Sequence, residues 1–114
     1  MELSFKTNKL KKECEDPKLA QKQYGKQIGT KLTQRIMEFI AAEDLNDIVK
    51  NKTNGFHKLA GDRKDEFAVY IVHPFRIVFT ADVCFDDENN INYKEIDLVR
   101  IEEVTDYHGK NKRK

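Results

Sequence analysis

Apolar and polar residues follow two different periods along this chain, and the change falls near residue 55. Before it, apolar residues recur at helical spacing, so that Leu32, Ile36, Phe39 and Ile40 lie on one face of a helix. After it, apolar residues run continuously or alternate with polar ones, as they do in strands. The chain therefore divides into a helical first half and a strand-rich second half.

The first half predicts a short strand followed by two to three helices. Residues 2–5 alternate polar and apolar side chains, which indicates the strand. A short helix is expected over residues 8–13. Asp16 followed by Pro17 is a favourable start for a second helix, which we expect to continue to Ile40. Residues 43–49 predict a further helical turn.

The second half predicts an antiparallel sheet. Residues 67–72 and 75–79 are rich in β-branched and aromatic side chains, and the short His73-Pro74 connection between them predicts a hairpin. Residues 86–90 form a polar turn, and the alternation over residues 91–104 predicts another strand. This order of elements indicates an α+β domain in which the helices pack on one face of a small antiparallel sheet.

Length and composition allow one thin hydrophobic core. The 114 residues are 39% hydrophobic and 36% charged, which suits a single domain over residues 1–109 and a basic, disordered tail over residues 110–114. No stretch approaches the roughly 20 apolar residues of a membrane span, and the N-terminus lacks the apolar core of a signal peptide. We therefore expect a cytoplasmic protein in which Cys14 and Cys84 are reduced thiols.

The charges are segregated although the net charge is only +1. Acidic residues concentrate at positions 82–88 and 95–106. Such a distribution favours a polyanion on one side and a basic partner on the other, whereas any single lysine can equally belong to a solvated helix face. The basic group of the first half is Lys6, Lys9, Lys11, Lys12, Lys18, Lys22, Lys26, Lys31 and Arg35.

Three histidines and one arginine lie near the ends of the strand-like segments. Imidazole is the side chain most easily used as an acid or base near neutral pH, and a guanidinium group suits a phosphate. Arg76 lies within an otherwise apolar strand, where it needs an anionic partner. If the sheet brings His57, Arg76 and His108 to a shared edge, they predict chemistry on a phosphodiester.

Each of these residues also has a purely structural interpretation. His57 is an ordinary strand-end residue in that case, and His73 belongs to the turn before Pro74. Arg76 then pairs with an acid such as Asp106 across the sheet, and Tyr107 is a packed aromatic residue.

Three ordered segments of the second half carry a family resemblance. They are residues 57–64, which read His-Lys-Leu-Ala-Gly-Asp-Arg-Lys before a strand, residues 75–79, which read Phe-Arg-Ile-Val-Phe, and residues 101–108, which end in Asp-Tyr-His. In this combination and at this length, the chain resembles the RelE/HigB-like toxins of type II toxin–antitoxin systems. It is closest to the HigB-like branch, whose chains similarly end in Asp-Tyr-His.

The resemblance implies an endoribonuclease that cuts messenger RNA on the translating ribosome. It also implies that no metal or other cofactor takes part and that a cognate antitoxin, with a helix-turn-helix segment, silences the enzyme. The 2′-hydroxyl of the RNA is the nucleophile, and the products are a cyclic phosphate and a 5′-hydroxyl. By resemblance, the catalytic positions are His57, Arg76, Tyr107 and His108, with Asp106 orienting a neighbour.

The residue chemistry fits this reaction. Attack by a 2′-hydroxyl needs a base, a cation beside the phosphorane and an acid for the leaving oxygen. His57 and His108 can serve as the proton-transfer pair, in either order. Arg76 can hold the phosphate with a bidentate fork, with Lys58 or Arg63 assisting. Tyr107 would supply a hydrogen bond or a stacking face for a base.

Two alternatives keep the fold and change the function. ParE-like relatives poison DNA gyrase by protein contact and do not need the histidine and arginine set. A non-catalytic module could instead bind nucleic acid through the basic helices alone. Other enzyme classes are excluded because the chain has no glycine-rich phosphate loop, no HExxH motif and no paired-cysteine metal spacing.

Overall fold

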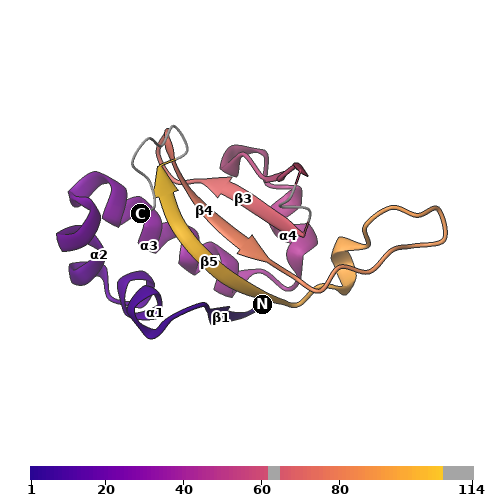
Figure 1. Ribbon diagram of the computed structural model, residues 1–114, viewed down its shortest axis with the longest axis horizontal. Helices are drawn as coiled ribbons and strands as arrows, with labels where there is room; N and C mark the ends of the chain where they lie inside the picture. The colour runs from indigo at the N-terminus through magenta and orange to yellow at the C-terminus, as the bar shows by residue number, and fades with distance from the viewer. Residues whose placement is uncertain (62–64, 107–114) are drawn as a thin grey trace.

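The computed structural model describes residues 1–61 and 65–106 (Figure 1). The predicted basic tail, together with the site candidates Arg63, Tyr107 and His108, lies outside the described residues. The elements follow the order β1 (Glu2–Phe5), α1 (Asn8–Glu15), α2 (Pro17–Tyr24), α3 (Lys26–Ala41), α4 (Leu45–Val49), η1 (Lys52–Asn54), β2 (His57–Lys58), β3 (Glu66–Tyr70), β4 (Phe75–Thr80), η3 (Tyr93–Glu95) and β5 (Leu98–Asp106).

The described strands form one five-stranded sheet in the order β1-β5-β4-β3-β2. The predicted α+β class is confirmed, and so is the predicted hairpin, which pairs β3 with β4. The sheet is mixed rather than wholly antiparallel, because β1 runs parallel to β5, with Glu2 opposite Leu98. The chain enters the sheet beside its last strand, and the helices then carry it across to the opposite edge.

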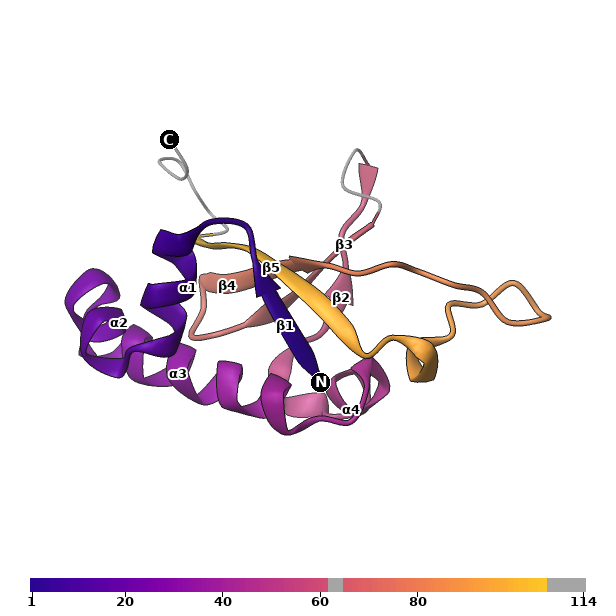
Figure 2. The same cartoon turned by 90° about the horizontal axis from the view of Figure 1, so that it is seen from below.

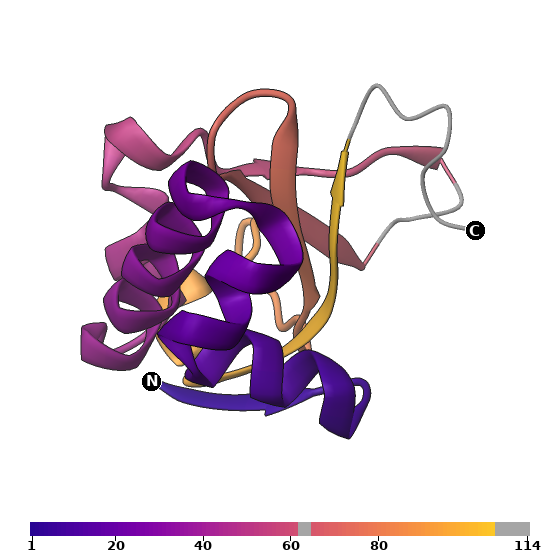
Figure 3. The ribbon, with the colours of Figure 1, turned by 90° about the vertical axis from the view of Figure 1, so that its left-hand side faces the viewer.

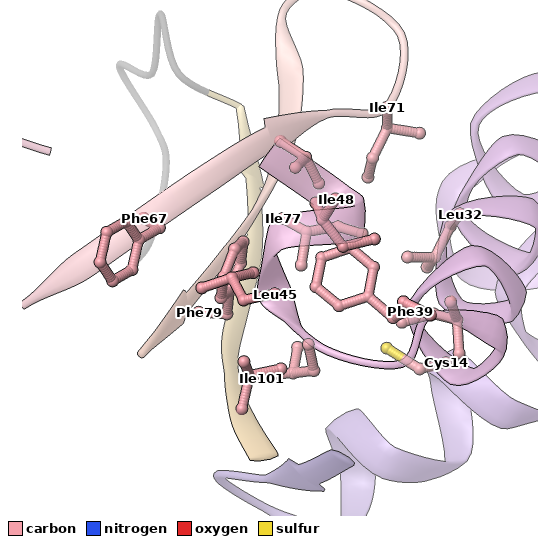
Figure 4. Packing of buried hydrophobic residues seen from close by; sticks show 14 of the residues in the cluster. Cys14, Leu32, Phe39, Leu45, Ile48, Phe67, Ile71, Ile77, Phe79 and Ile101 are labelled. Carbon is pink, nitrogen blue, oxygen red and sulfur yellow. The ribbon is translucent and has the colours of Figure 1, made fainter. Parts of the chain in front are cut away.

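All four α-helices of the described chain lie on one face of the sheet, as Figures 2 and 3 show. The main core fills the space between these two layers. Figure 4 shows Leu32 and Phe39 of α3 facing Ile77 and Phe79 of β4. The rings of Phe39 and Phe79 meet edge to face at 5.1 Å, a favoured geometry for aromatic pairs. We call the other face of the sheet, which none of these helices covers, the open face.

The predicted long helix is wrong in one respect, because it is two helices. Asp16 caps α2 as predicted, and its carboxylate accepts hydrogen bonds from two backbone N–H groups of the first turn. The helix then ends at Gly25, whose φ of +91° suits glycine and breaks the helical path. The chain turns there, and α3 packs back against α2. Ile40, predicted on the core face, is 52% exposed.

The predicted strand over residues 91–104 begins later, at Leu98. Ile91 forms only an isolated bridge with Phe85, and residues 93–95 form the 3-10 helix η3. Ile96 is buried, and its carbonyl oxygen accepts a hydrogen bond from the N–H of Leu45 in α4 rather than from a strand. The alternating pattern thus reflects burial against α4, whereas the remaining segment forms an arm that extends from the sheet (Figures 1 and 2).

The most basic and the most acidic segments lie at opposite ends of the molecule. The lysine-rich helices α1 and α2 stand at one end, and the arm over residues 81–97, which carries all four acidic residues at positions 82–88, stands at the other, while the acidic residues at positions 95–106 continue along β5 (Figure 1). Part of the lysine charge is paired locally, because Lys9 and Lys11 lie near Glu13 and Glu15 one turn along α1. Among the described helices, none has the length and apolar character that crossing a membrane requires.

The two cysteines occupy opposite environments. Cys14 is 1% exposed, within the core between α1 and α3, whereas Cys84 is exposed on the arm. Burial, reinforced by the carboxylates of Glu13 and Glu15, raises the pKa of the Cys14 thiol to about 12. Since the thiolate is the nucleophile, Cys14 should be inert in the folded protein.

We therefore expect iodoacetamide to modify Cys84 rapidly and Cys14 only after unfolding, as measured by mass spectrometry at about pH 8. The Cys84→Ser variant is the control and should show no modification until denaturant is added. Rapid native modification of Cys14 would contradict this description of the core.

Candidate active site

His57 lies on β2 at the edge of the sheet, and the loop before it fixes its position. The side chain of Asn54, 1% exposed, donates to the carbonyl oxygen of Ile48 and accepts from the N–H of Phe56. Nδ1 of His57 lies 2.9 Å from the carbonyl oxygen of Gly55. A proton on Nδ1 satisfies that contact and leaves Nε2 as the nitrogen able to accept or deliver a proton.

Tyr70 is the residue around which the described part of the site is arranged. Its ring centroid lies 5.9 Å from that of His57 and 6.0 Å from that of His73 in the β3–β4 turn. The ring also presses on the backbone of Gly55, where an added Cβ would lie only 2.4 Å from Cδ2 of Tyr70. Glycine is thus needed at position 55 for two reasons: its φ of +66° disfavours other residues, and a side chain would collide with the ring of Tyr70.

Arg76 lies on the same face as His57 and Tyr70. In β4 it is opposite Tyr70 of β3 on one side and Thr105 of β5 on the other. His57 is opposite Ala68, two residues before Tyr70. Directly paired residues of neighbouring strands lie on the same face of a sheet, and so do residues two apart along one strand. His57, Tyr70 and Arg76 therefore lie on one side of the sheet. This side is the open face, since Phe67, Val69 and Ile77, at the intervening positions, lie in the helix-side core.

The geometry differs from the predicted shared edge. His57 is on the edge strand, whereas Arg76 is on β4, with β3 between them. His57 and Arg76 therefore share a face of the sheet but not an edge. We call His57, Tyr70, His73 and Arg76 the open-face cluster. On β5, Glu103 is opposite Val78 and so lies on the same face as Arg76, whereas Glu102 accepts a hydrogen bond from Thr80 and lies 3.4 Å from Arg100.

Two predicted substrate contacts do not join this cluster. Lys58 is opposite Phe67, and its Nζ lies 6.0 Å from the centroid of that ring, on the helix side of the sheet. Asp106 is opposite Phe75, so alternation assigns it to the same side, while its neighbour Thr105 shares the face of Arg76. Both assignments stay predictions, as do those of Arg63, Tyr107 and His108 outside the described residues.

Arg35 of α3 supports the cluster from the helix side. It was grouped with the basic residues available to a polyanion, but its side chain is 5% exposed. The guanidinium donates to the carbonyl oxygens of Tyr70 and Thr53 at 2.8 and 3.3 Å and to Oε1 of Glu38 at 2.9 Å. Arg35 therefore holds together α3, the strand that carries Tyr70 and the loop that leads to His57.

Sequence reasoning missed Tyr70 and treated His73 as a turn residue. The pattern did contain a signal for Tyr70. Within residues 67–71, Phe67, Val69 and Ile71 share one face, and this places Tyr70 on the other face beside Arg76 in a hairpin. No comparable signal exists for His73, because a turn residue has no alternation to assign its direction.

The contact between Gly55 and Tyr70 can be tested by substitution. Gly55→Ala should destabilise the fold by about 2–3 kcal/mol, because it adds a steric clash to the cost of a left-handed backbone. Gly61→Ala is the matched control: its φ is +70°, but no atom of the described residues lies within 4 Å of the added Cβ, so it should cost only about 1 kcal/mol. Urea unfolding measures both values.

The double variant Gly55→Ala/Tyr70→Ala then isolates the clash. It should lose less stability than the sum of the two single variants, since the atoms that collide are gone. Equal costs for Gly55→Ala and Gly61→Ala would show that the tyrosine ring does not depend on this glycine.

Comparison with known proteins does not assign the chain to a family. No known family model matches it, and a search of curated proteins finds no match either. The support for a function is therefore the geometry of the open-face cluster, together with the resemblance of three ordered sequence segments.

Proposed function

We propose that this protein is a RelE/HigB-like toxin that acts as a metal-independent endoribonuclease on messenger RNA at the translating ribosome. The observation that carries the proposal is the common face of His57 and Arg76, with the His57 imidazole held at Nδ1 by Gly55. Activity of this kind in the cytoplasm implies a cognate antitoxin, for which we propose a helix-turn-helix protein.

The reaction requires two proton transfers around one phosphate. A base removes the proton of the 2′-hydroxyl, O2′ attacks phosphorus, and the bond from phosphorus to O5′ breaks as an acid protonates O5′. His57 can fill either role through Nε2, and His108 is the second imidazole by resemblance. The products are a 2′,3′-cyclic phosphate and a 5′-hydroxyl, and the need for a 2′-hydroxyl restricts the reaction to RNA.

Arg76 supplies the positive charge that the phosphorane requires. Arg76 is half-buried within a sheet strand, where water screens a charge less than at the surface. The fork of a guanidinium matches two phosphate oxygens at once. Lysine would not reproduce this geometry, so Arg76→Lys should be impaired as well as Arg76→Ala.

The test is to map new 5′ ends on a reporter messenger RNA translated in a cell-free extract. We expect cuts at codon positions that disappear when translation initiation is blocked. Arg76→Ala should reduce cleavage by about 10²–10³-fold and His57→Ala by about 10²–10⁴-fold. Arg100→Ala, which removes an exposed arginine elsewhere on the sheet, is the matched control and should retain activity.

The other outcomes are equally informative. Cuts that persist without initiation would replace ribosome-dependent cleavage with cleavage of free RNA. Full activity of both site variants would overturn the assignment of the open-face cluster. No cleavage by the folded wild-type protein would overturn the nuclease proposal and leave gyrase poisoning or a non-catalytic nucleic-acid-binding module.

A further inference from the structure

A groove lies where the β3–β4 turn meets α3. Its volume is about 620 Å³, and it is open toward solvent, so it suits a surface contact rather than an enclosed ligand. The described residues that line it include two cationic and two neutral polar side chains and no acidic one. They are Lys26, Gln27, Thr30 and Lys31 of α3 and Val72 of the turn.

The groove continues the open-face cluster around the end of the sheet. Val72 lines the groove, and the next residue, His73, contacts the ring of Tyr70. Tyr70 in turn lies beside His57 and opposite Arg76. A strand of RNA that binds at Arg76 and passes Tyr70 and His73 therefore reaches Val72, where the described residues that line the groove include no carboxylate.

The positive charge in the groove is available to a ligand. Lys26 is exposed, and Lys31 donates only to the neutral amide oxygen of Gln34, at 3.2 Å. Lys31 also attracts Glu38, whose carboxylate already accepts hydrogen bonds from Gln34 and Arg35. Lys26 and Lys31 both line the groove from α3, five residues apart, so both charges act on an anion bound there.

We propose that this groove binds the phosphate of a neighbouring nucleotide of single-stranded RNA, with Lys26 and Lys31 as its ligands. The intervening base stacks on His73, which is exposed and stands nearly perpendicular to Tyr70, since aromatic rings bind unpaired bases without regard to sequence. The proposal rests on the proposed function, because it extends the substrate path from the same cluster. The groove would let the enzyme bind RNA through a phosphate other than the one that reacts.

The test separates binding from cleavage. A fluorescent 2′-O-methyl RNA oligonucleotide cannot supply the attacking hydroxyl, so its fluorescence anisotropy reports binding alone. Lys26→Ala/Lys31→Ala should weaken binding about tenfold and lower the slope of log K against log salt by about 1. Lys12→Ala/Lys18→Ala removes the same charge from exposed positions outside the groove and should change binding less than about twofold.

A second variant fills the groove and leaves its charges in place. Thr30→Trp, at an exposed helix position, should weaken binding to a similar degree while the protein melts near the wild-type temperature. If both double lysine variants weakened RNA binding equally, the RNA would be attracted to the basic surface in general, and the proposed phosphate site in the groove would be wrong.

Failure of the groove and failure of the proposed function are distinguishable. Wild-type cleavage of unmodified RNA with unchanged binding by Lys26→Ala/Lys31→Ala would overturn the groove alone. Groove-dependent binding without any cleavage on the ribosome would support the groove and overturn the nuclease. A wild-type protein that neither binds nor cleaves RNA would overturn both.

Discussion

The buried guanidinium of Arg35 is the interaction on which the arrangement of the site depends. It satisfies carbonyl oxygens of β3 and of the loop before β2 and is neutralised by Glu38 on its own helix. Burial alone would raise the pKa of Glu38. Hydrogen bonds from Gln34 and Arg35, together with the nearby positive charges, have the larger combined effect, and the pKa of Glu38 lies below its ordinary value. Because the Glu38 side chain is 29% exposed and Arg35 keeps two carbonyl partners, losing Glu38 should cost less than the roughly 3–5 kcal/mol of a fully buried pair.

The two faces of the sheet have separate roles, and strand alternation keeps them apart. One side of β3 and β4 contributes large apolar residues to the main core beneath α3, whereas the other carries Tyr70 and Arg76 beside a small buried cluster of Leu59, Ala68 and Val78. Chemistry on the open face can therefore change without repacking the core. The same rule carries a constraint, since a shift of one residue in the β3–β4 register would bury Arg76 and expose Ile77.

Local patterns predicted most of the fold. The capping pair Asp16-Pro17, the β-branched hairpin and the first strand all have signals within a few residues, and the structure confirms them. The pattern does not reveal the break at Gly25, because an isolated glycine can either be tolerated within a helix, at a cost of about 1 kcal/mol, or end it. The late start of β5 was missed because burial of Ile96 against α4 produces the same alternation as a strand.

The site was harder to predict from the sequence than the fold. The residue types of His57 and Arg76 indicated chemistry, but their common face depends on a register that joins β2, β3 and β4 over long range. Arg35 was grouped with surface lysines because composition cannot distinguish a buried arginine from an exposed one. Its role depends on two carbonyl groups that are 18 and 35 residues away in sequence.

The acidic arm has a consequence for how the protein meets a large polyanion. With a net charge of +1, the molecule as a whole is drawn to an anionic surface only weakly. Its charges are nevertheless separated along a longest dimension of 45 Å, several times the Debye length of about 8 Å at physiological salt. The two ends are therefore felt separately at close range, where the arm is repelled and the lysine-rich helices are attracted. Such a field exerts a torque on the molecule before contact. Encounters in which the lysine-rich helices face the polyanion are therefore favoured over other orientations.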